Sequence, residues 1–127
     1  MKYDVVILMG SDSDLEKMRP AAQFLTEMEI PCGMFVISAH RAIDLLANAV
    51  RNWTQEGTKV FIAGAGLAAH LPGVVAGLTH RPVIGVPLEA KSALMSGLDS
   101  VMAILQMPPG VPVATVALNG SVNAAIL

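Results

Sequence analysis

The stretch Y-D-V-V-I-L-M-G-S-D-S-D, residues 3–14, shows how this chain builds its fold. Its apolar half, residues 3–9, is continuous rather than alternating, which is typical of a strand in a sheet that is covered on both faces. Its polar half leads into residues 15–29, where apolar side chains recur at helical spacing. The stretch therefore predicts a buried strand, a turn and a helix, in that order.

The same alternation continues to the end of the sequence. The apolar runs that predict strands are residues 3–9, 33–37, 59–63, 82–86 and 111–118. The segments that predict helices are residues 15–29, 44–55 and 90–106, and a short last helix opens at 122–127. This order predicts one α/β domain over residues 1–127, with a doubly wound, five-stranded parallel sheet.

The composition limits the class of protein. The net charge is -2 and no basic run is present, which argues against nucleic-acid binding. No apolar stretch reaches the roughly 18 residues of a membrane span, and the single cysteine, Cys32, excludes a disulfide framework. Only 14% of the residues are charged, so we expect apolar surface that is buried between subunits. These features predict a cytoplasmic homo-oligomer that is associated with neither membrane nor nucleic acid.

Polar and small residues gather where the predicted strands end, the edge at which folds of this kind bind ligands. G-S-D-S-D (10–14) follows the first strand and opens a helix, whose free N–H groups would attract a phosphate. The alternative is a plain helix start, since Ser13 and Glu16 fit a capping box. Serine hydroxyls suit a phosphate, whereas the carboxylate of Asp14 suits ribose hydroxyls.

S-A-H-R (38–41) follows the second strand. Arg41 offers a planar fork for phosphate or carboxylate, and His40 can transfer a proton near neutral pH. An ordinary surface turn is the alternative. The position of His40 and Arg41 opposite the loop of residues 10–14, the serine loop, favours a site. Asp44 is interpreted as a helix cap rather than as a chemical group.

G-A-G-L-A-A (64–69) follows the third strand and matches the dinucleotide pattern G-x-G-x-x-A. The unit is third in the chain, so a tight turn permitted by glycines, or a smaller ligand, is favoured over NAD. His70 is either a second catalytic imidazole or a helix-capping group. His70 and His80 lack the i, i+4 spacing of a metal pair, and no metal site is expected.

Taken together, these loops resemble one family. The motifs are M-G-S-D-S-D (9–14), S-A-H-R (38–41), A-G-A-G-L-A-A-H-L-P-G (63–73), P-V-I-G-V-P (82–87), S-G-L-D-S (96–100) and Q-M-P-P-G-V-P-V-A-T (106–115). In order and spacing they are similar to the N5-carboxyaminoimidazole ribonucleotide mutases, the PurE family of bacterial purine synthesis. S-A-H-R with A-A-H-L-P-G looks like the mutase class rather than the carboxylase class, whose equivalents tend to read S-A-H-K and A-G-R-S-N.

The resemblance implies a flavodoxin-like three-layer αβα sandwich, usually a homo-octamer, that acts on a small ribonucleotide without metal or organic cofactor. It implies that the carboxyl group of N5-carboxyaminoimidazole ribonucleotide (N5-CAIR) moves to C4 of the imidazole, giving 4-carboxy-5-aminoimidazole ribonucleotide (CAIR). His40 would be the general acid/base. The residues that it implies for substrate binding are Ser11, Ser13, Asp14, Ser38, Ala39, Arg41, Gly64, Ala65, Gly66, His70 and Leu71.

The sequence departs from the family pattern in three places. Ala42 and Ile43 stand where the family usually has Thr-Pro, and Leu67 stands where it usually has Gly, which adds bulk at the ring pocket. The C-terminal helix of typical members is expected to be missing beyond Leu127. Two alternatives therefore stay open: direct carboxylation of aminoimidazole ribonucleotide (AIR) or a related ribonucleotide by free CO2, and a non-catalytic nucleotide-binding module.

Overall fold

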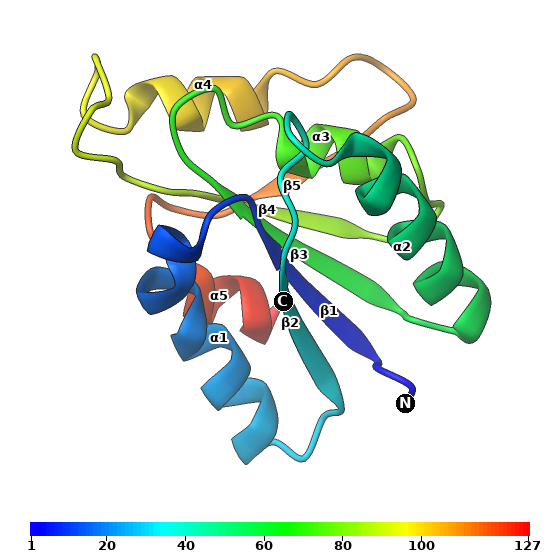
Figure 1. The fold of residues 1–127 in the computed structure, drawn as a ribbon. Helices are drawn as coiled ribbons and strands as arrows, with labels where there is room; N and C mark the ends of the chain where they lie inside the picture. Colours follow the sequence, from blue (N-terminus) through cyan, green and yellow to red (C-terminus); the bar gives the residue numbers. More distant parts are fainter.

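A computed structural model describes residues 1–127, and its centre is one parallel sheet. The strands are β1 (Val5–Met9), β2 (Cys32–Val36), β3 (Val60–Ala65), β4 (Val83–Pro87) and β5 (Ala114–Thr115). Their order across the sheet is β2-β1-β3-β4-β5 (Figure 1). The chain thus winds outward in both directions from the boundary between β1 and β3. The predicted doubly wound, five-stranded parallel sheet is confirmed, and its strand order is the flavodoxin-like one.

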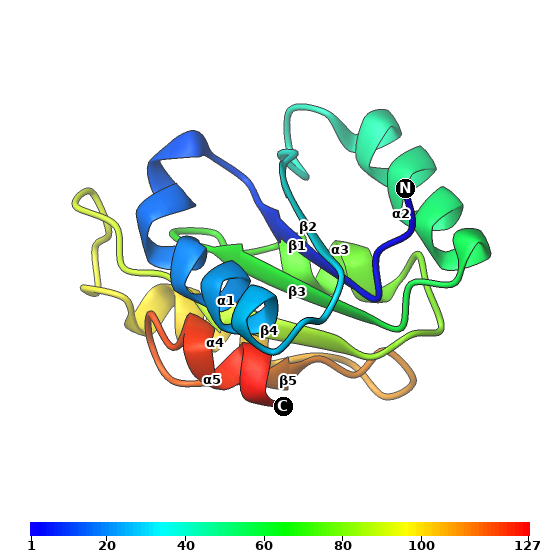
Figure 2. The ribbon, with the colours of Figure 1, turned by 90° about the horizontal axis from the view of Figure 1, so that it is seen from below.

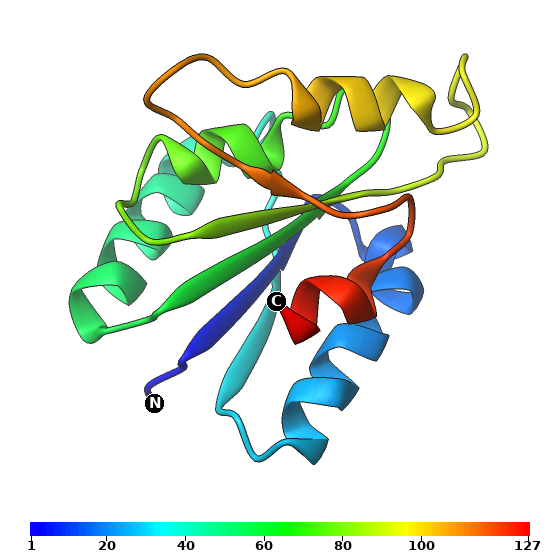
Figure 3. The same cartoon turned by 180° about the vertical axis from the view of Figure 1, so that it is seen from behind.

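Helices cover both faces of the sheet. They are α1 (Leu15–Glu27), α2 (Ile43–Glu56), α3 (Leu71–Ala76), α4 (Leu98–Leu105) and α5 (Ser121–Ile126), with a short 3-10 helix η1 (Asp12–Asp14) before α1. α1 and α5 lie side by side on one face, and α2, α3 and α4 lie on the other (Figures 1 and 2). The view from behind shows α5 packed along α1 near the end of the chain (Figure 3). None of these helices has the length and apolar character needed to cross a membrane.

The central strands supply side chains to two separate cores. On β1, Val6 and Leu8 pack with α2, α3 and α4, whereas Ile7 and Met9 pack with α1 and α5, and all four are fully buried. This two-sided burial explains why the run is apolar throughout rather than alternating. Burying one such side chain stabilises a fold by about 1.5–3 kcal/mol relative to leaving it exposed. The two cores hold the carboxyl ends of the strands in fixed positions.

The segment before α4 differs from the prediction. Helical spacing predicts a helix over 90–106, but α4 begins at Leu98. Ser96 and Gly97 have φ angles of 52° and 102°, in the left-handed region, which a right-handed helix cannot include. Residues 88–97 are therefore a loop at the carboxyl end of β4. The last strand is also shorter than predicted, because β5 pairs with β4 through only two residues.

Two predicted helix caps are wrong. The Oγ of Ser11, not that of Ser13, accepts a backbone N–H, and it caps η1 rather than α1. α1 then begins at Leu15 with no side-chain cap, because η1 leads directly into it. α2 begins at Ile43, so Asp44 lies inside its first turn and caps nothing. The loop that contains Ser11 and Ser13 is therefore held by its own hydroxyls.

Candidate active site

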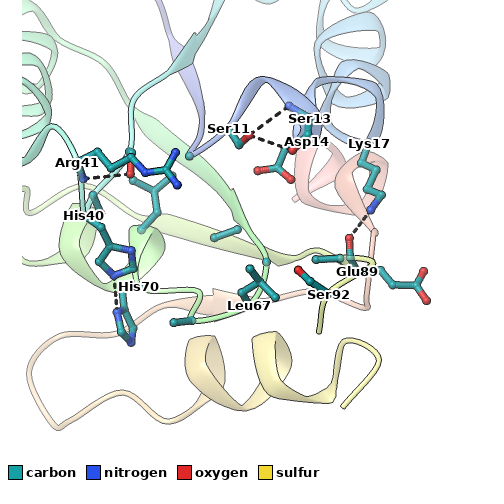
Figure 4. A pocket seen from close by; sticks show the side chains of 18 of the residues that line it. Ser11, Ser13, Asp14, Lys17, His40, Arg41, Leu67, His70, Glu89 and Ser92 are labelled. Carbon is teal, nitrogen blue, oxygen red and sulfur yellow. Dashed lines mark hydrogen bonds between the residues drawn. The ribbon is translucent and has the colours of Figure 1, made fainter. Parts of the chain in front are cut away.

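A cavity of about 760 Å³ opens where β1, β2, β3 and β4 end (Figure 4). It lies at the boundary between β1 and β3, where winding reverses and open α/β sheets bind ligands. All but one of the site residues expected from the sequence line it. These are Ser11, Ser13, Asp14, Ser38, Ala39, His40, Arg41, Ala65, Gly66, His70 and Leu71.

The exception is Gly64, which is buried within β3 and does not line the cavity. A Cβ added there would collide with the Met18 side chain on α1. The glycine therefore permits close packing of α1 on the sheet, behind the pocket rather than in it.

The serine loop presents two hydroxyls. Ser11 Oγ lies 2.9 Å from Ser13 Oγ and accepts a hydrogen bond from the Ser13 backbone N–H at 3.3 Å. These contacts fix both side chains at the rim of the cavity, where each hydroxyl can still bond a ligand oxygen. The loop is thus pre-formed for an acceptor-rich group.

Arg41 faces this loop from across the cavity. Ser38 Oγ accepts a hydrogen bond from the Arg41 backbone N–H at 3.2 Å, which closes the turn after β2. The Arg41 guanidinium points toward the side on which Ser11 lies (Figure 4). The one side-chain ion pair in the chain joins Lys59 to Asp4, so Arg41 has no carboxylate partner. A free guanidinium opposite two hydroxyls suits a bound phosphate.

Asp14 lies next to the serine loop and is half-buried. Burial raises the pKa of its carboxyl above the usual 3.8, with a smaller increase from the neighbouring charge of Asp12. The positive charge of Lys17 and a backbone hydrogen bond from Ser11 act in the opposite direction on this pKa. Lys17 in turn donates a hydrogen bond from Nζ to the carbonyl oxygen of Glu89, which connects α1 to the loop after β4.

Two imidazoles form the opposite end of the cavity. His40 Nε2 and His70 Nδ1 are 2.7 Å apart, and the rings are nearly perpendicular, at 84°. One nitrogen must donate and the other accept, so the pair shares a single proton along this contact. The alternative of a capping role for His70 is wrong, because its side chain makes no cap hydrogen bond although the residue stands at the start of α3.

Several further residues line the cavity. Leu67 was expected at the ring pocket, and Gly10 and Ala68 lie in loops that the sequence singled out. The lining residues that were not predicted are Glu16, Lys17, Glu89, Ala90, Lys91 and Ser92. Residues 90–92 were missed because their segment was assigned to a helix. The signal that could have found them is Ser96-Gly97, a break that makes the preceding residues a loop after a parallel strand.

The fold and the cavity define a class: doubly wound α/β proteins that hold a small polar ligand at the carboxyl ends of their strands. Within that class, residues 4–127 match the AIR carboxylase family, and the chain belongs to it. The resemblance inferred from the loop motifs is confirmed.

Named relatives of the chain are similar over nearly its whole length. The N5-carboxyaminoimidazole ribonucleotide mutase of Pyrococcus abyssi is 54% identical over 123 residues, which are 97% of this chain and 70% of that protein. The phosphoribosylaminoimidazole carboxylase of Schizosaccharomyces pombe is also 54% identical over 123 residues, but these are only 22% of its length. The crystal structure of Treponema denticola PurE superposes with a TM-score of 0.85 at 29% identity, over 96% of this chain and 75% of that one.

Proposed function

We propose that this chain is an N5-carboxyaminoimidazole ribonucleotide mutase, an isomerase of purine biosynthesis that converts N5-CAIR into CAIR. The observation that carries the proposal is the pair of imidazoles, 2.7 Å apart, in one cavity with an unpaired guanidinium and two hydroxyls. Support also comes from the mutases of Pyrococcus abyssi and Thermotoga maritima, each 54% identical to the chain.

The cavity offers a different group to each part of the ribonucleotide. Ser11, Ser13, Ser38 and Arg41 would bind the phosphate, and Asp14 would accept hydrogen bonds from the ribose. The flat base would lie against the loop after β3, where Ala65, Gly66 and Ala68 carry little or no side chain. His40 would then stand beside the reacting atoms of the imidazole.

The reaction moves one carboxyl group and leaves the number of protons on the substrate and on His40 unchanged. The bond from N5 to the carboxyl carbon breaks and releases CO2, and N5 takes a proton from His40. C4 then forms a bond to the CO2 carbon and loses its own proton to His40. Because the proton given and the proton taken are equal in number, one imidazole completes the cycle. His70 stabilises the protonated and neutral forms of His40 by accepting or donating along their shared contact.

The assembly proposed for the chain is a homo-oligomer, with the octamer of the resembled family as its expected form and the cytoplasm as its expected location. Large apolar side chains are exposed on loop 88–97 and α4. They are Leu94, Met95, Leu98, Met102 and Leu105. This surface adjoins the cavity, since residues 89–92 line it. A second copy seated there would cover apolar surface and close the open side of the site.

A direct carboxylase is the second candidate, favoured by the identity to the carboxylase of Schizosaccharomyces pombe. Purified protein given N5-CAIR, or AIR with bicarbonate and dissolved CO2, separates the two by following imidazole absorbance. CAIR formed from N5-CAIR at a rate that added CO2 does not change is expected. Turnover only from AIR and CO2 would contradict the mutase assignment, and ligand binding without turnover from either would indicate a non-catalytic module.

A further inference from the structure

The loop after β4 is exposed at its tip but held at its stem. The side-chain amide of Asn119 bonds Glu89 twice: Oδ1 accepts a hydrogen bond from the Glu89 backbone N–H at 3.0 Å, and Nδ2 donates to Glu89 Oε2 at 3.3 Å. A backbone N–H can only donate and a carboxylate only accepts, so the orientation of this amide is determined. Asn119 and Glu89 therefore form a two-point clamp on the first residues of the loop.

The clamp continues the sheet beyond its last paired residues. β5 pairs with β4 only as far as Gly85 and Thr115. Farther along, Asn119 donates its backbone N–H to the Pro87 carbonyl oxygen at 2.8 Å, and its side chain then accepts from Glu89. The φ of Asn119 is 58°, in the left-handed region, which asparagine tolerates better than most residues. A side chain thus replaces strand pairing at the point where β4 passes into the loop.

Glu89 is held from another side by α1. Lys17 donates a hydrogen bond from Nζ to the Glu89 carbonyl oxygen, and the Lys17 carbonyl oxygen accepts one from Ser121 Oγ, at the start of α5, at 2.7 Å. Three segments therefore hold one another: α1, the stem of the loop and the start of α5. Glu89 and Lys17 line the cavity on the side away from the two imidazoles (Figure 4), whereas Asn119 does not line it.

We infer that Asn119 is a positioning residue of the site that the proposed function, on which this inference rests, assigns to the ribonucleotide. Asn119 acts through Glu89, because the residues that follow Glu89, 90–92, form a wall of the cavity. A Cβ on Gly66 would lie 3.5 Å from Ala90 Cβ, so this wall stands against the loop on which the flat base would lie. A wall that is already held in place needs little ordering when the ligand binds. The clamp therefore lowers the entropic cost of binding.

The donor and the acceptor of the clamp can be exchanged, which gives a specific test. Asn119→Asp keeps the shape of the side chain and the acceptor for the Glu89 N–H, but it sets one carboxylate against another. Adding Glu89→Gln supplies an amide that can donate to the new carboxylate, so the double variant again has both bonds.

We expect Asn119→Asp to raise the KM for N5-CAIR, and the Kd of CAIR measured by calorimetry, about 3- to 10-fold. In the Glu89→Gln background the same substitution should raise them less than about twofold. The kcat should change less than about twofold in both backgrounds, because the wall borders substrate and product alike. Asn119→Gly keeps the left-handed backbone and removes both bonds. It should raise the Kd of CAIR by the same factor as Asn119→Asp, so the test does not depend on the folding of one variant.

Asn123→Asp is the matched control. Asn123 is exposed on α5 and lies outside the cavity, so the control adds the same charge without contact to Glu89. Melting temperatures check that each variant folds. The inference is overturned if Asn119→Asp has the same effect with Glu89 and with Glu89→Gln, or an effect no larger than that of Asn123→Asp. A parental Kd in Asn119→Gly would overturn it as well.

Failure of the proposed function would be seen separately. If the parent binds CAIR but forms none from N5-CAIR, the mutase proposal fails, and the Kd of CAIR in the same set of variants still decides the role of Asn119. If the parent does not bind CAIR, both the proposed function and the inference are overturned.

Discussion

The two sides of the cavity are built differently. The loops after β1 and β2 are short, and hydrogen bonds within them hold Ser11, Ser13 and Arg41 in place. The loop after β4, residues 88–97, is longer, and Leu94 on it is 96% exposed. The first side is held by contacts within one chain, whereas the second exposes apolar surface that a second copy would cover in the proposed assembly. The proposed function therefore assigns ligand binding to the single chain and closure of the site to the assembly.

The largest effect on activity should come from a substitution in the loops after β1 and β2, the side of the cavity that is held by its own hydrogen bonds. His40→Asn removes the proton-transferring group but leaves a side chain that can still hydrogen-bond His70. We expect turnover of N5-CAIR to fall by about 10²–10⁴-fold, the usual contribution of a general acid/base. Binding of CAIR, measured by calorimetry, should stay within a factor of about three. Equal turnover in variant and parent would contradict the role proposed for His40.

Arg41→Ala should weaken binding more than it slows chemistry. Loss of one charge-assisted hydrogen bond costs about 1.5–3 kcal/mol, so KM should rise about 10- to 150-fold while kcat changes little. Arg51→Ala is the matched control, since Arg51 lies on α2 outside the cavity. A KM for Arg41→Ala equal to that of the control would exclude a phosphate contact.

Asp14→Asn should have an intermediate effect and a distinct pH signature. Burial raises the pKa of Asp14, so the folded chain binds this proton more tightly than the unfolded chain does. The stability contributed by Asp14 is therefore greatest at low pH and decreases as pH rises through the raised pKa. We expect the stability of Asp14→Asn to decrease less steeply with rising pH than that of the parent. Its melting temperature at pH 7 should be equal to that of the parent or higher. Ligand binding should weaken about tenfold.

Melting curves from pH 3 to 8, with calorimetry at pH 7, measure both effects. A melting temperature that decreases with pH as steeply in the variant as in the parent would show that another group causes the pH dependence.

The smallest effect on the stability of a single subunit should come from a substitution on the other side of the cavity, which loop 88–97 and α4 form. Leu98 on α4 is 51% exposed, so Leu98→Glu should change the free energy of unfolding of a single subunit by less than about 0.5 kcal/mol. We expect it nevertheless to reduce the assembled mass seen by light scattering, because a carboxylate would be buried in the proposed contact. Glu56→Gln, exposed at the end of α2, is the control. An unchanged mass for Leu98→Glu would remove α4 from the contact.

The same contrast explains what the sequence could predict. Strands β1 to β4 follow from continuous apolar runs, and the loops after β1 and β2 follow from where those runs stop. The contact between His40 and His70 could not be read in this way, since the residues are 30 positions apart and only the sheet order brings them together. The late start of α4 depends on left-handed backbone at Ser96 and Gly97, which helical spacing does not reveal. Gly64 looked like part of a ligand loop because tertiary packing against Met18 leaves no trace in a local motif.

The contact between Gly64 and Met18 also constrains how such a chain can evolve. The space for one side chain is shared between the sheet and α1, so neither position can enlarge unless the other shrinks. Met18 is fully buried and stands one turn after the serine loop. A mutation at Gly64 would therefore shift the loop as well as the core, and the two positions should accept substitutions as a pair rather than one at a time.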